Sequence, residues 1–249
     1  MTTDGADGAD AVPTIQTVRR LALVLSAFTV NQPYLSLRQI TARLGASKAT
    51  AHRYTKALRA ANLLRYDERT ALYSLGPQVL TLAASARAGL PIVTVAEPYL
   101  EKLVRQVDET VVLSVWDGEA PTVVRSADNT DQVIRISVRA GSRLDPTASA
   151  QGQVFCAYLP PDQVPGLHRL LRQSPELRDE LAAIRAHGLS VHAPPVDGVR
   201  TIAAPVFEGG GIVATIAIVG TTVGVPAEPD SPAADALRAT AEELSRRLA

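Results

Sequence analysis

Apolar residues recur at helical spacing in three consecutive segments between positions 18 and 61. Side chains three and four residues apart lie on one face of an α-helix. The pattern therefore predicts three amphipathic helices that pack around a shared core. The residues predicted to face this core are Val18, Leu21, Leu25 and Phe28 in the first helix, Leu37, Ile40 and Leu44 in the second, and Ala51, Tyr54, Leu58 and Ala61 in the third.

Turn signals separate these segments. Gly45 can adopt a left-handed conformation at little cost, so we expect it to end the second helix. Ser47 can accept backbone N–H groups as the N-cap of a third helix over Lys48–Ala60. Two short strands, residues 64–66 and 71–75, then flank the polar turn DERT. Three helices followed by such a hairpin are typical of a winged helix-turn-helix.

Charge is distributed unevenly along the chain, although the total net charge is zero. Residues 13–88 contain eleven Lys or Arg against two acidic residues, a net charge of +9, whereas residues 89–249 contain 14 basic and 20 acidic residues, a net charge of −6. A basic surface binds duplex DNA because it releases the counterions of the phosphates. The sequence therefore predicts that the first third of the chain binds double-stranded DNA.

The third helix and the wing carry the candidate DNA contacts. The N-terminal half of a recognition helix enters the major groove, and polar groups around it contact the phosphates. His52 could contact a base or a phosphate, or be only a polar surface residue, and we expect Arg59 to be solvated. The alternative to the whole assignment is a three-helix bundle with a merely solvated basic face. The candidate DNA-binding residues are Arg38, Lys48, Ala49, Thr50, His52, Arg53, Lys56, Arg65 and Arg69.

The remainder of the chain predicts a linker helix and a second domain. A proline in the first turn and an apolar stripe after it predict a helix over residues 76–87. Strand and turn signals then alternate with helical segments, which predicts an α+β domain of the GAF or PAS type, an antiparallel sheet with flanking helices. The predicted strands are residues 111–116, 121–126, 133–138, 201–207 and 212–220, and the predicted helices are 93–107, 148–158, 163–173, 176–187 and 231–248.

Other features exclude several classes of protein. The first twelve residues are small and acidic, so we expect a disordered tail rather than a signal peptide. No apolar run approaches the roughly 18 residues that span a bilayer, so we expect no membrane association and a cytoplasmic location. A single cysteine, Cys156, excludes an intrachain disulfide, and we expect it to be a small buried residue. Catalytic motifs, metal-ligand sets and cofactor loops are missing, so we expect no enzyme activity, metal or cofactor.

Four strings then point to a family. They are ASKATAHRYTKAL, LYSLGPQVLTLA, AGSRLDPTASAQGQVFCAYLP and GVRTIAAPVF. In this order and spacing they resemble the IclR family of bacterial transcriptional regulators, and the resemblance covers nearly the whole chain after the tail. It implies a winged helix-turn-helix domain over residues 13–75, a linker helix over 76–90 and an effector-binding domain over 91–249, in a homodimer or homotetramer.

The resemblance also implies a site for a small organic acid. In the family, a carboxylate ligand commonly binds backbone amides at the start of the helix within ASAQGQV, because a helix N-terminus offers free N–H groups to an anion. Gly152 would let the ligand approach the backbone closely. The positions that the resemblance places at the site are Leu144, Ala150, Gln151, Gly152 and Gln153, with His192, Thr201, Ala217 and Val219 on later segments.

Four of these positions depart from the family pattern. His192 stands where an acidic residue is common, Thr201 where a cysteine is common, and Ala217 and Val219 where serines are common. We therefore expect a larger or more apolar effector, such as an aromatic acid, or none. Ala217 and Val219 could equally fill a core, and His192 could be a surface residue in a loop. Two functions stay open: a regulator that a small effector modulates, and a regulator whose C-terminal domain serves only dimerisation or protein interaction.

Overall fold

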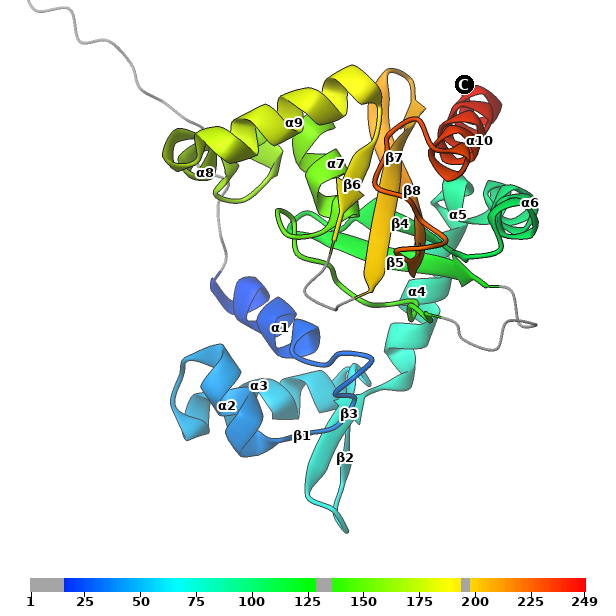
Figure 1. Cartoon of the computed structure of the whole chain (residues 1–249). Coiled ribbons are helices and arrows are strands. Elements are labelled where there is room, and N and C mark those ends of the chain that lie inside the picture. The colour runs from blue at the N-terminus through cyan, green and yellow to red at the C-terminus, as the bar shows by residue number, and fades with distance from the viewer. Residues whose placement is uncertain (1–15, 129–135, 194–197) are drawn as a thin grey trace, which may run out of the picture. The chain divides into compact units, whose positions relative to one another are not determined.

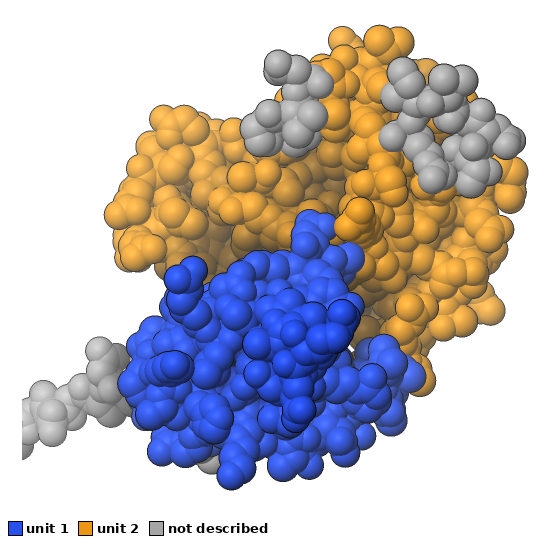
Figure 2. Space-filling model, turned by 90° about the horizontal axis from the view of Figure 1, so that it is seen from below, with its two compact units in different colours: residues 1–85 blue, residues 86–249 orange. Residues whose placement is uncertain are grey.

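The structure is a computed structural model that describes residues 16–128, 136–193 and 198–249. The chain divides between Ser85 and Ala86 into two compact units, which we call unit 1 and unit 2 (Figure 2). The twelve residues predicted to form a tail lie outside the described residues.

Unit 1 contains the three predicted helices, α1 (Gln16–Ser26), α2 (Leu37–Leu44) and α3 (Lys48–Ala60) (Figure 1). Their apolar faces meet in one cluster, and most of the predicted core residues belong to it. Two predictions were wrong. Val18 is 60% exposed, because the apolar surface of α1 is broader than its core contact. Ala61 is exposed because α3 ends one residue earlier.

The predicted turn between α2 and α3 is confirmed. Gly45 adopts a left-handed conformation with φ of 59° and ends α2. Ser47 then accepts the N–H of Thr50 at 3.2 Å and caps α3. In addition, Ser36 and Gln39 form a reciprocal capping box at the start of α2. Such caps satisfy backbone groups that a helix end leaves unpaired, so both helix starts are fixed locally.

The wing is an antiparallel hairpin of β2 (Leu64–Asp67) and β3 (Leu72–Leu75), as predicted. A third strand that the sequence did not predict, β1 (Leu35–Ser36), pairs with β3, so the order is β1-β3-β2. Two residues are too few to show the alternation of apolar and polar positions that identifies a strand. The wing is therefore joined to the helical core through the segment that precedes α2.

Helix α4 (Pro77–Ala88) is the predicted linker helix, and it spans the division between the units. All of α4 is described, and none of its side chains is buried. Leu80 is 74% exposed and Leu82 is 53% exposed. The apolar stripe predicted for this helix thus faces solvent in a single chain.

Unit 2 is an α+β domain, as predicted. Its described strands form a five-stranded antiparallel sheet of order β5-β4-β8-β7-β6. The strands are β4 (Thr110–Trp116), β5 (Pro121–Ala127), β6 (Ser190–His192), β7 (Val199–Glu208) and β8 (Gly211–Thr221). The helices are α5 (Pro91–Val95), α6 (Glu97–Val107), α7 (Ala150–Tyr158), α8 (Leu167–Gln173), α9 (Pro175–His187) and α10 (Pro232–Leu248).

Helices cover both faces of this sheet, with α7 and α9 on one side and α6 and α10 on the other (Figure 1). Successive side chains of a strand point to opposite faces. On β8, Ile216 and Ile218 pack into the core with α6 and α10, whereas Ala217 packs against α7. We call the side of the sheet that carries Ala217 the α7 face.

Several predicted elements need correction. The helix predicted over residues 93–107 is two helices that meet at Ala96, because Pro98 has no N–H to continue the first one and fits the first turn of the second. The helix predicted over 163–173 begins only at Leu167. Of the strand predicted over 133–138, residues 136–138 form no regular element and the rest lies outside the described residues. His192 ends β6 rather than lying in a loop.

Candidate DNA-binding surface and effector site

The surface of α3 opposite the core of unit 1 is basic. Ala51, Tyr54 and Leu58 are buried. On the opposite side of the same helix, Arg53 and Lys56 are exposed. Three further predicted contacts on α3, namely Lys48, Ala49 and His52, are exposed as well, and Thr50 is half-buried. The predicted division of α3 into a core face and a basic face is therefore confirmed.

A groove of about 610 Å³ runs beside α3, between the start of α2 and the wing. Basic side chains from two helices line it together with two tyrosines of the wing strands. These residues are Arg38, Lys48, His52, Arg59, Tyr66 and Tyr73. The fold thus gathers onto one groove charges that are separated by up to twenty residues in the sequence, and this arrangement suits a sugar–phosphate chain.

Arg59 and Tyr66 connect α3 to the wing. Arg59 is exposed, as predicted, but its guanidinium carbon also lies 5.2 Å from the centre of the Tyr66 ring. The Tyr66 ring in turn lies 4.7 Å from that of Tyr73. A guanidinium over an aromatic face is held electrostatically. Sequence analysis missed this pair, although an arginine and an aromatic residue on adjacent elements were a possible signal.

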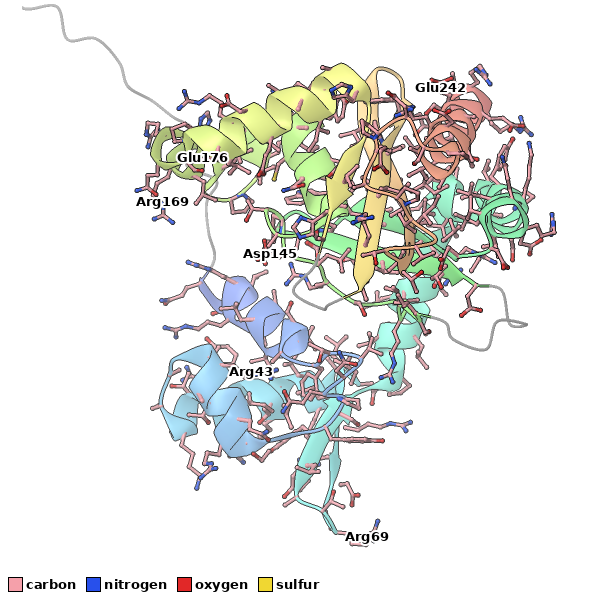
Figure 3. All side chains as sticks on the ribbon, viewed as in Figure 1. Arg43, Arg69, Asp145, Arg169, Glu176 and Glu242 are labelled. Atoms are coloured by element: carbon pink, nitrogen blue, oxygen red, sulfur yellow. The ribbon has the colours of Figure 1, made fainter. Side chains whose placement is uncertain are left out.

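The tip of the wing carries the predicted Arg69 (Figure 3). Arg65 is exposed on β2. The carboxylate of Asp67 accepts the N–H of Arg69 at 2.9 Å. This backbone hydrogen bond, with further bonds from Thr70, lowers the pKa of Asp67. The acidic residue therefore shapes the turn while leaving both arginine side chains exposed.

Two other arginines of the basic segment stabilise unit 1 internally. Arg43 donates to the carbonyl of Ala27 and to the side chain of Gln32. A hydrogen bond from Arg20 is the main cause of a lowered pKa at Tyr54. The net charge of residues 13–88 thus exceeds the charge available for DNA. Thr50, another predicted DNA contact, is half-buried, and its hydroxyl oxygen accepts a hydrogen bond from the Ser47 hydroxyl at 3.0 Å.

In unit 2, the candidate effector site lies at the start of α7. Ser149 caps this helix and accepts the N–H of Gly152 at 3.1 Å through its hydroxyl. The carboxylate of Asp145 accepts the N–H groups of Thr147 and Ala148, both at 2.8 Å, which lowers its pKa (Figure 3). These contacts fix the segment before the helix and use one N–H of its first turn. Ala150 and Gln151 are the first two residues of α7, and the dipole of a helix favours an anion near its first N–H groups.

The fold brings the predicted strand positions together on the α7 face. His192 pairs with Thr201, which pairs in turn with Val219. Paired residues in a sheet have side chains on the same face. Ala217 lies two residues from Val219 on β8 and packs against α7. His192, Thr201, Ala217 and Val219 therefore share one surface, although they come from three strands.

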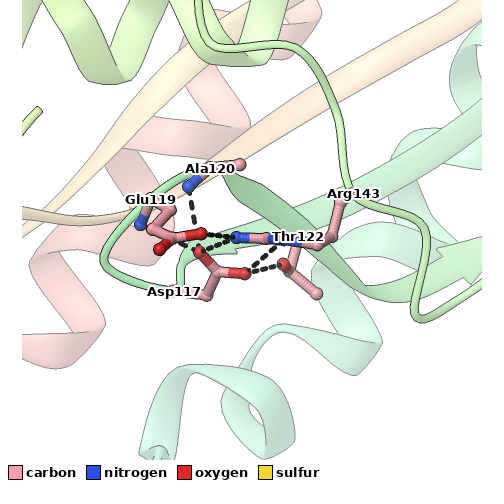
Figure 4. Close-up of polar contacts among 5 residues, drawn as sticks. All are labelled: Asp117, Glu119, Ala120, Thr122 and Arg143. Atoms are coloured by element: carbon pink, nitrogen blue, oxygen red, sulfur yellow. Dashed lines mark hydrogen bonds and ion pairs between the residues drawn. The ribbon is translucent and has the colours of Figure 1, made fainter. Parts of the chain in front are cut away.

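Leu144 joins this surface through an apolar cluster with Val112, Val123 and Val219. Its position is fixed by the preceding residue (Figure 4). Arg143 forms ion pairs with Asp117 at 2.7 Å and with Glu119 at 3.1 Å. The segment before α7 is thereby tied to the β4–β5 turn.

Asp117 is the centre of that network. Its carboxylate also accepts the N–H of Ala120 at 2.9 Å and the hydroxyl of Thr122 at 3.0 Å. Burial opposes its ionisation, but these donors and Arg143 together lower the pKa of Asp117. The carboxylate stays charged and holds Arg143 in place.

The polar side chains of the first turn of α7 already have partners within the protein. Gln151 is 3% exposed and donates its amide to the hydroxyl of Ser114 at 3.0 Å. Gln153 donates to Glu180 at 3.1 Å and accepts the hydroxyl of Ser190 at 2.8 Å. These contacts were not predicted, since the partners lie on distant strands and helices. They leave the backbone, rather than the glutamine side chains, to contact a ligand.

The structure gives a further reason for glycine at position 152. A Cβ at this position would lie 2.3 Å from the carbonyl oxygen of Asp145 and 2.4 Å from that of Pro146. The close approach of the chain's own backbone therefore requires glycine at this position, independently of any ligand. Cys156, on the same helix, is 1% exposed, as predicted, and burial raises the pKa of its thiol to about 12.

The two units are thus a winged helix-turn-helix with a basic surface and an α+β domain. The model of the bacterial transcriptional regulator IclR C-terminal domain matches residues 84–246, and that of the IclR helix-turn-helix domain matches residues 17–68. The chain belongs to the IclR family and is a DNA-binding transcriptional regulator of that type.

Similarities to individual proteins support this family assignment. An HTH-type transcriptional regulator of Mycobacterium tuberculosis is 29% identical over 86% of this chain and 83% of its own length. A crystal structure of a Silicibacter protein assigned to the IclR regulators is 26% identical, with a TM-score of 0.82 over 93% of this chain and 96% of that chain. The fold is also that of an IclR homologue from Microbacterium hydrocarbonoxydans complexed with 4-hydroxybenzoate, which is 21% identical with a TM-score of 0.73 over 93% of this chain and 98% of that one.

The matched family and these relatives are regulators rather than enzymes. Across residues 16–128, 136–193 and 198–249, no group of three or more His, Cys, Asp or Glu side chains could hold a metal ion. Within the same ranges, every helix is too short or too polar to cross a membrane.

Proposed function

We propose that this regulator binds operator DNA as a homodimer or homotetramer and that a small organic acid, bound in unit 2, changes its affinity for DNA. The proposal assigns DNA binding to residues 13–75, linkage to 76–90 and effector binding to 91–249. Two observations, one on each unit, support it. Unit 1 has a groove lined by basic side chains, and in unit 2 the first turn of α7 lies against the sheet.

DNA binding would use α3 in the major groove and the wing on the backbone. The exposed face of α3 and the groove beside it support this arrangement. Two such units bind half-sites about one helical turn, or a multiple of it, apart. The residues proposed to contact DNA are Arg38, Lys48, Ala49, Thr50, His52, Arg53, Lys56, Arg65 and Arg69.

Effector binding would use the first turn of α7. The backbone of Ala150 and Gln151 would bind a carboxylate, and Leu144 and the strand residues of the α7 face would contact the rest of the molecule. The complex of a related fold with 4-hydroxybenzoate supports an aromatic acid as one class of ligand. A ligand changes DNA affinity only if it prefers one arrangement of the protein.

Self-association would use the exposed apolar side chains of the first and fourth helices. Leu23 on α1 is 45% exposed, and Leu80 and Leu82 on α4 are more exposed still. Apolar side chains left exposed along two helices gain free energy when a second copy covers them. Sedimentation of the purified protein would measure the oligomeric state directly.

The rival function has one observation in its favour. Ala217 is fully buried and Val219 is 8% exposed, and both glutamines at the start of α7 have internal partners. In this alternative, unit 2 is a filled dimerisation or protein-interaction module without an effector. It predicts that no small molecule stabilises the protein against heat.

One experiment separates the two functions. Genomic fragments retained by the purified protein are first identified by footprinting, and the protein–DNA complex is then titrated with a panel of aromatic and aliphatic acids. The proposal expects one class of acid both to raise the melting temperature and to change operator affinity. Operator binding that no acid alters, together with unchanged melting, would support the rival. Failure to retain any fragment at low salt would contradict both.

A further inference from the structure

The groove beside α3, here called the α3 groove, is lined by cations that have no carboxylate partner within unit 1. Arg38, Lys48 and Arg59 are exposed and line it together. Among the residues that the structure describes, none of the three forms an ion pair. Like charges that share a concave surface repel each other and attract an anion. The α3 groove therefore attracts an anion even when no DNA is bound.

The acidic residues of unit 1 do not supply that anion. Residues 16–85 contain ten Lys or Arg against two acidic residues, Asp67 and Glu68, which is a net charge of +8. Asp67 accepts the backbone N–H of Arg69 in the wing turn, and neither acidic residue lines the α3 groove. A partner of opposite charge has to come from elsewhere.

A segment of the same chain has the complementary charge. Residues 1–15, which lie outside the described residues, contain three aspartates and no Lys or Arg. The aspartates are Asp4, Asp7 and Asp10, and only glycine and alanine stand between them. We call residues 4–10 the acidic segment. Its carboxylates recur at every third position, so it presents negative charge along an extended chain, as the phosphates of a DNA strand do.

The chain is long enough for the acidic segment to reach the α3 groove. Asp10 precedes Gln16, the start of α1, by six residues, and Asp4 precedes it by twelve. Since an extended residue spans at most about 3.6 Å, these carboxylates reach up to about 20 Å and about 40 Å from that point. A unit of about 70 residues has a radius of gyration of only about 11 Å. Every face of unit 1 is therefore within reach, and the tether keeps the local concentration of the segment high.

We propose that the acidic segment occupies the α3 groove when DNA is absent, with its carboxylates against the three groove cations. DNA must then displace the segment, so the fraction of protein with a free groove sets the apparent affinity for DNA. The segment is an intramolecular competitor that weakens binding to every DNA sequence. This inference goes beyond the proposed function and rests only on its DNA-binding part.

The few lysines of the chain allow a direct test of this contact. They are Lys48 in the α3 groove, Lys56 on the same helix but outside the groove lining, and Lys102 in unit 2. The full-length protein is treated with a carbodiimide, which joins a carboxylate to an amine only where the two touch, and the joined peptides are identified by mass spectrometry. We expect the acidic segment to be joined to Lys48 at least fivefold more often than to Lys56, and duplex DNA to abolish the link.

Three outcomes of this experiment overturn the inference. They are equal joining to Lys48 and Lys56, no joining of the acidic segment to Lys48, and joining that DNA does not reduce. A mixture of isotopically light and heavy protein adds a fourth. Links between a light and a heavy chain alone would assign the α3 groove to the segment of a second copy instead.

A second experiment measures the competition. The variant Asp4→Asn, Asp7→Asn and Asp10→Asn keeps the length of the chain and removes the charge. It should bind a mixed-sequence duplex roughly fivefold more tightly at about 50 mM salt, and the gain should vanish near 0.5 M, where charges are screened within a few ångströms. The matched control carries the same change of net charge at three exposed positions of unit 2, Asp162→Asn, Asp179→Asn and Asp230→Asn, and should show less than a twofold gain.

Groove variants separate binding in the α3 groove from general repulsion of DNA by the acidic segment. Arg38→Gln with Arg59→Gln removes two groove cations, whereas Arg53→Gln with Lys56→Gln removes two exposed cations of α3 outside the groove lining. The gain caused by the three asparagines should fall to about twofold or less in the first background and persist in the second. The same gain in both backgrounds would mean repulsion without docking and would overturn the inference. If no variant binds DNA, the DNA-binding part of the proposed function fails, and the carbodiimide experiment still decides whether the segment occupies the groove.

Discussion

In unit 1 most of the polar side chains proposed to contact DNA are exposed, whereas in unit 2 the glutamines at the start of α7, beside the proposed effector site, are buried. Lys56 on α3 is exposed, and so is Arg53, whose guanidinium carbon lies 5.7 Å from the centre of the Tyr54 ring at the edge of the core. Gln151 and Gln153 on α7 are buried and bonded to other side chains. A DNA surface can thus be altered without altering the fold, but a site under α7 cannot. Binding and stability should separate in unit 1 and remain coupled in unit 2.

The largest expected effects come from two glycines at which the backbone leaves no space. Gly152→Ala would place a Cβ 2.3 Å from the Asp145 carbonyl oxygen, and Gly76→Ala would place one 2.0 Å from that of Asn62. Each should destabilise its own unit by about 3 kcal/mol, the upper end for overpacking. Because Trp116 lies in unit 2, its fluorescence should report the unfolding caused by Gly152→Ala but not that caused by Gly76→Ala.

Gly211→Ala is the matched control for these two variants. The nearest atom to its Cβ would be the Glu208 carbonyl oxygen at 3.8 Å, an ordinary contact. The melting temperature of Gly211→Ala should match that of the unaltered protein. A common melting shift at every probe for both Gly76→Ala and Gly152→Ala would contradict the independence of the units.

The next effect tests whether unit 1 alone carries the DNA contacts. Lys56→Ala should weaken binding to all DNA sequences roughly fivefold and reduce the log–log salt slope by about one, because one phosphate contact is lost. Stability should be unchanged, since the side chain is exposed. Arg172→Ala, an exposed cation of unit 2, should leave the slope as it was. Gel-shift titrations at several salt concentrations measure both, and an equal slope for Lys56→Ala and the unaltered protein would remove Lys56 from the contact surface.

A smaller effect concerns acid stability in unit 2. The pKa of Asp117 is lowered in the folded state. The ionised carboxylate therefore contributes to stability above the ordinary carboxyl pKa, and this contribution is lost as the pH falls through the pKa of Asp117 in the folded protein. Asp117→Asn should cost less than about 1 kcal/mol at pH 7, because the ion pair is partly exposed to solvent. The variant should also show a flatter fall of melting temperature between pH 7 and 3. The same acid dependence in both proteins would show that Arg143 is held by other groups.

The smallest expected effect is a gain in stability at pH 7 rather than a loss. Burial raises the pKa of Glu109, whose carboxyl group is packed where Gly220 and Gly224 leave space. Protonated Glu109 therefore favours the folded state at low pH, and this contribution to stability is lost as the pH rises through the pKa of Glu109 in the folded protein. Glu109→Gln should therefore melt slightly higher at pH 7 and no higher at pH 4. A lower melting temperature at pH 7 would show that the charged form is stabilised instead.

Local patterns predicted most of the elements correctly. The helix faces of α1 to α3, the left-handed Gly45 and the cap at Ser47 depend on neighbours within four residues, so the sequence contains them directly. Elements that depend on distant partners were missed. β1 exists because β3 pairs with it, and His192 ends a strand because β7 lies beside it.

The candidate sites show the same division. The residue types at the start of α7 and on α3 were visible in the sequence. Their surroundings were not, because Gln151 meets Ser114 across 37 positions and Arg59 meets Tyr66 only after the wing folds against α3. Whether a glutamine serves a ligand or the core depends on such contacts.

By itself, the sequence determined the family, the three-helix unit with its basic helix, and the α+β class of the second unit. Periodicity, caps and charge are properties of neighbouring residues, and they survive without knowledge of the fold. Only the tertiary structure decided which arginines of unit 1 bond to other groups of that unit, why a Cβ does not fit at position 152, and that, among the described residues, the Thr215 hydroxyl and the Trp116 indole nitrogen are buried without a hydrogen-bond partner. Burial and hydrogen bonding are set by residues far apart in the chain, so they are decided when the chain folds.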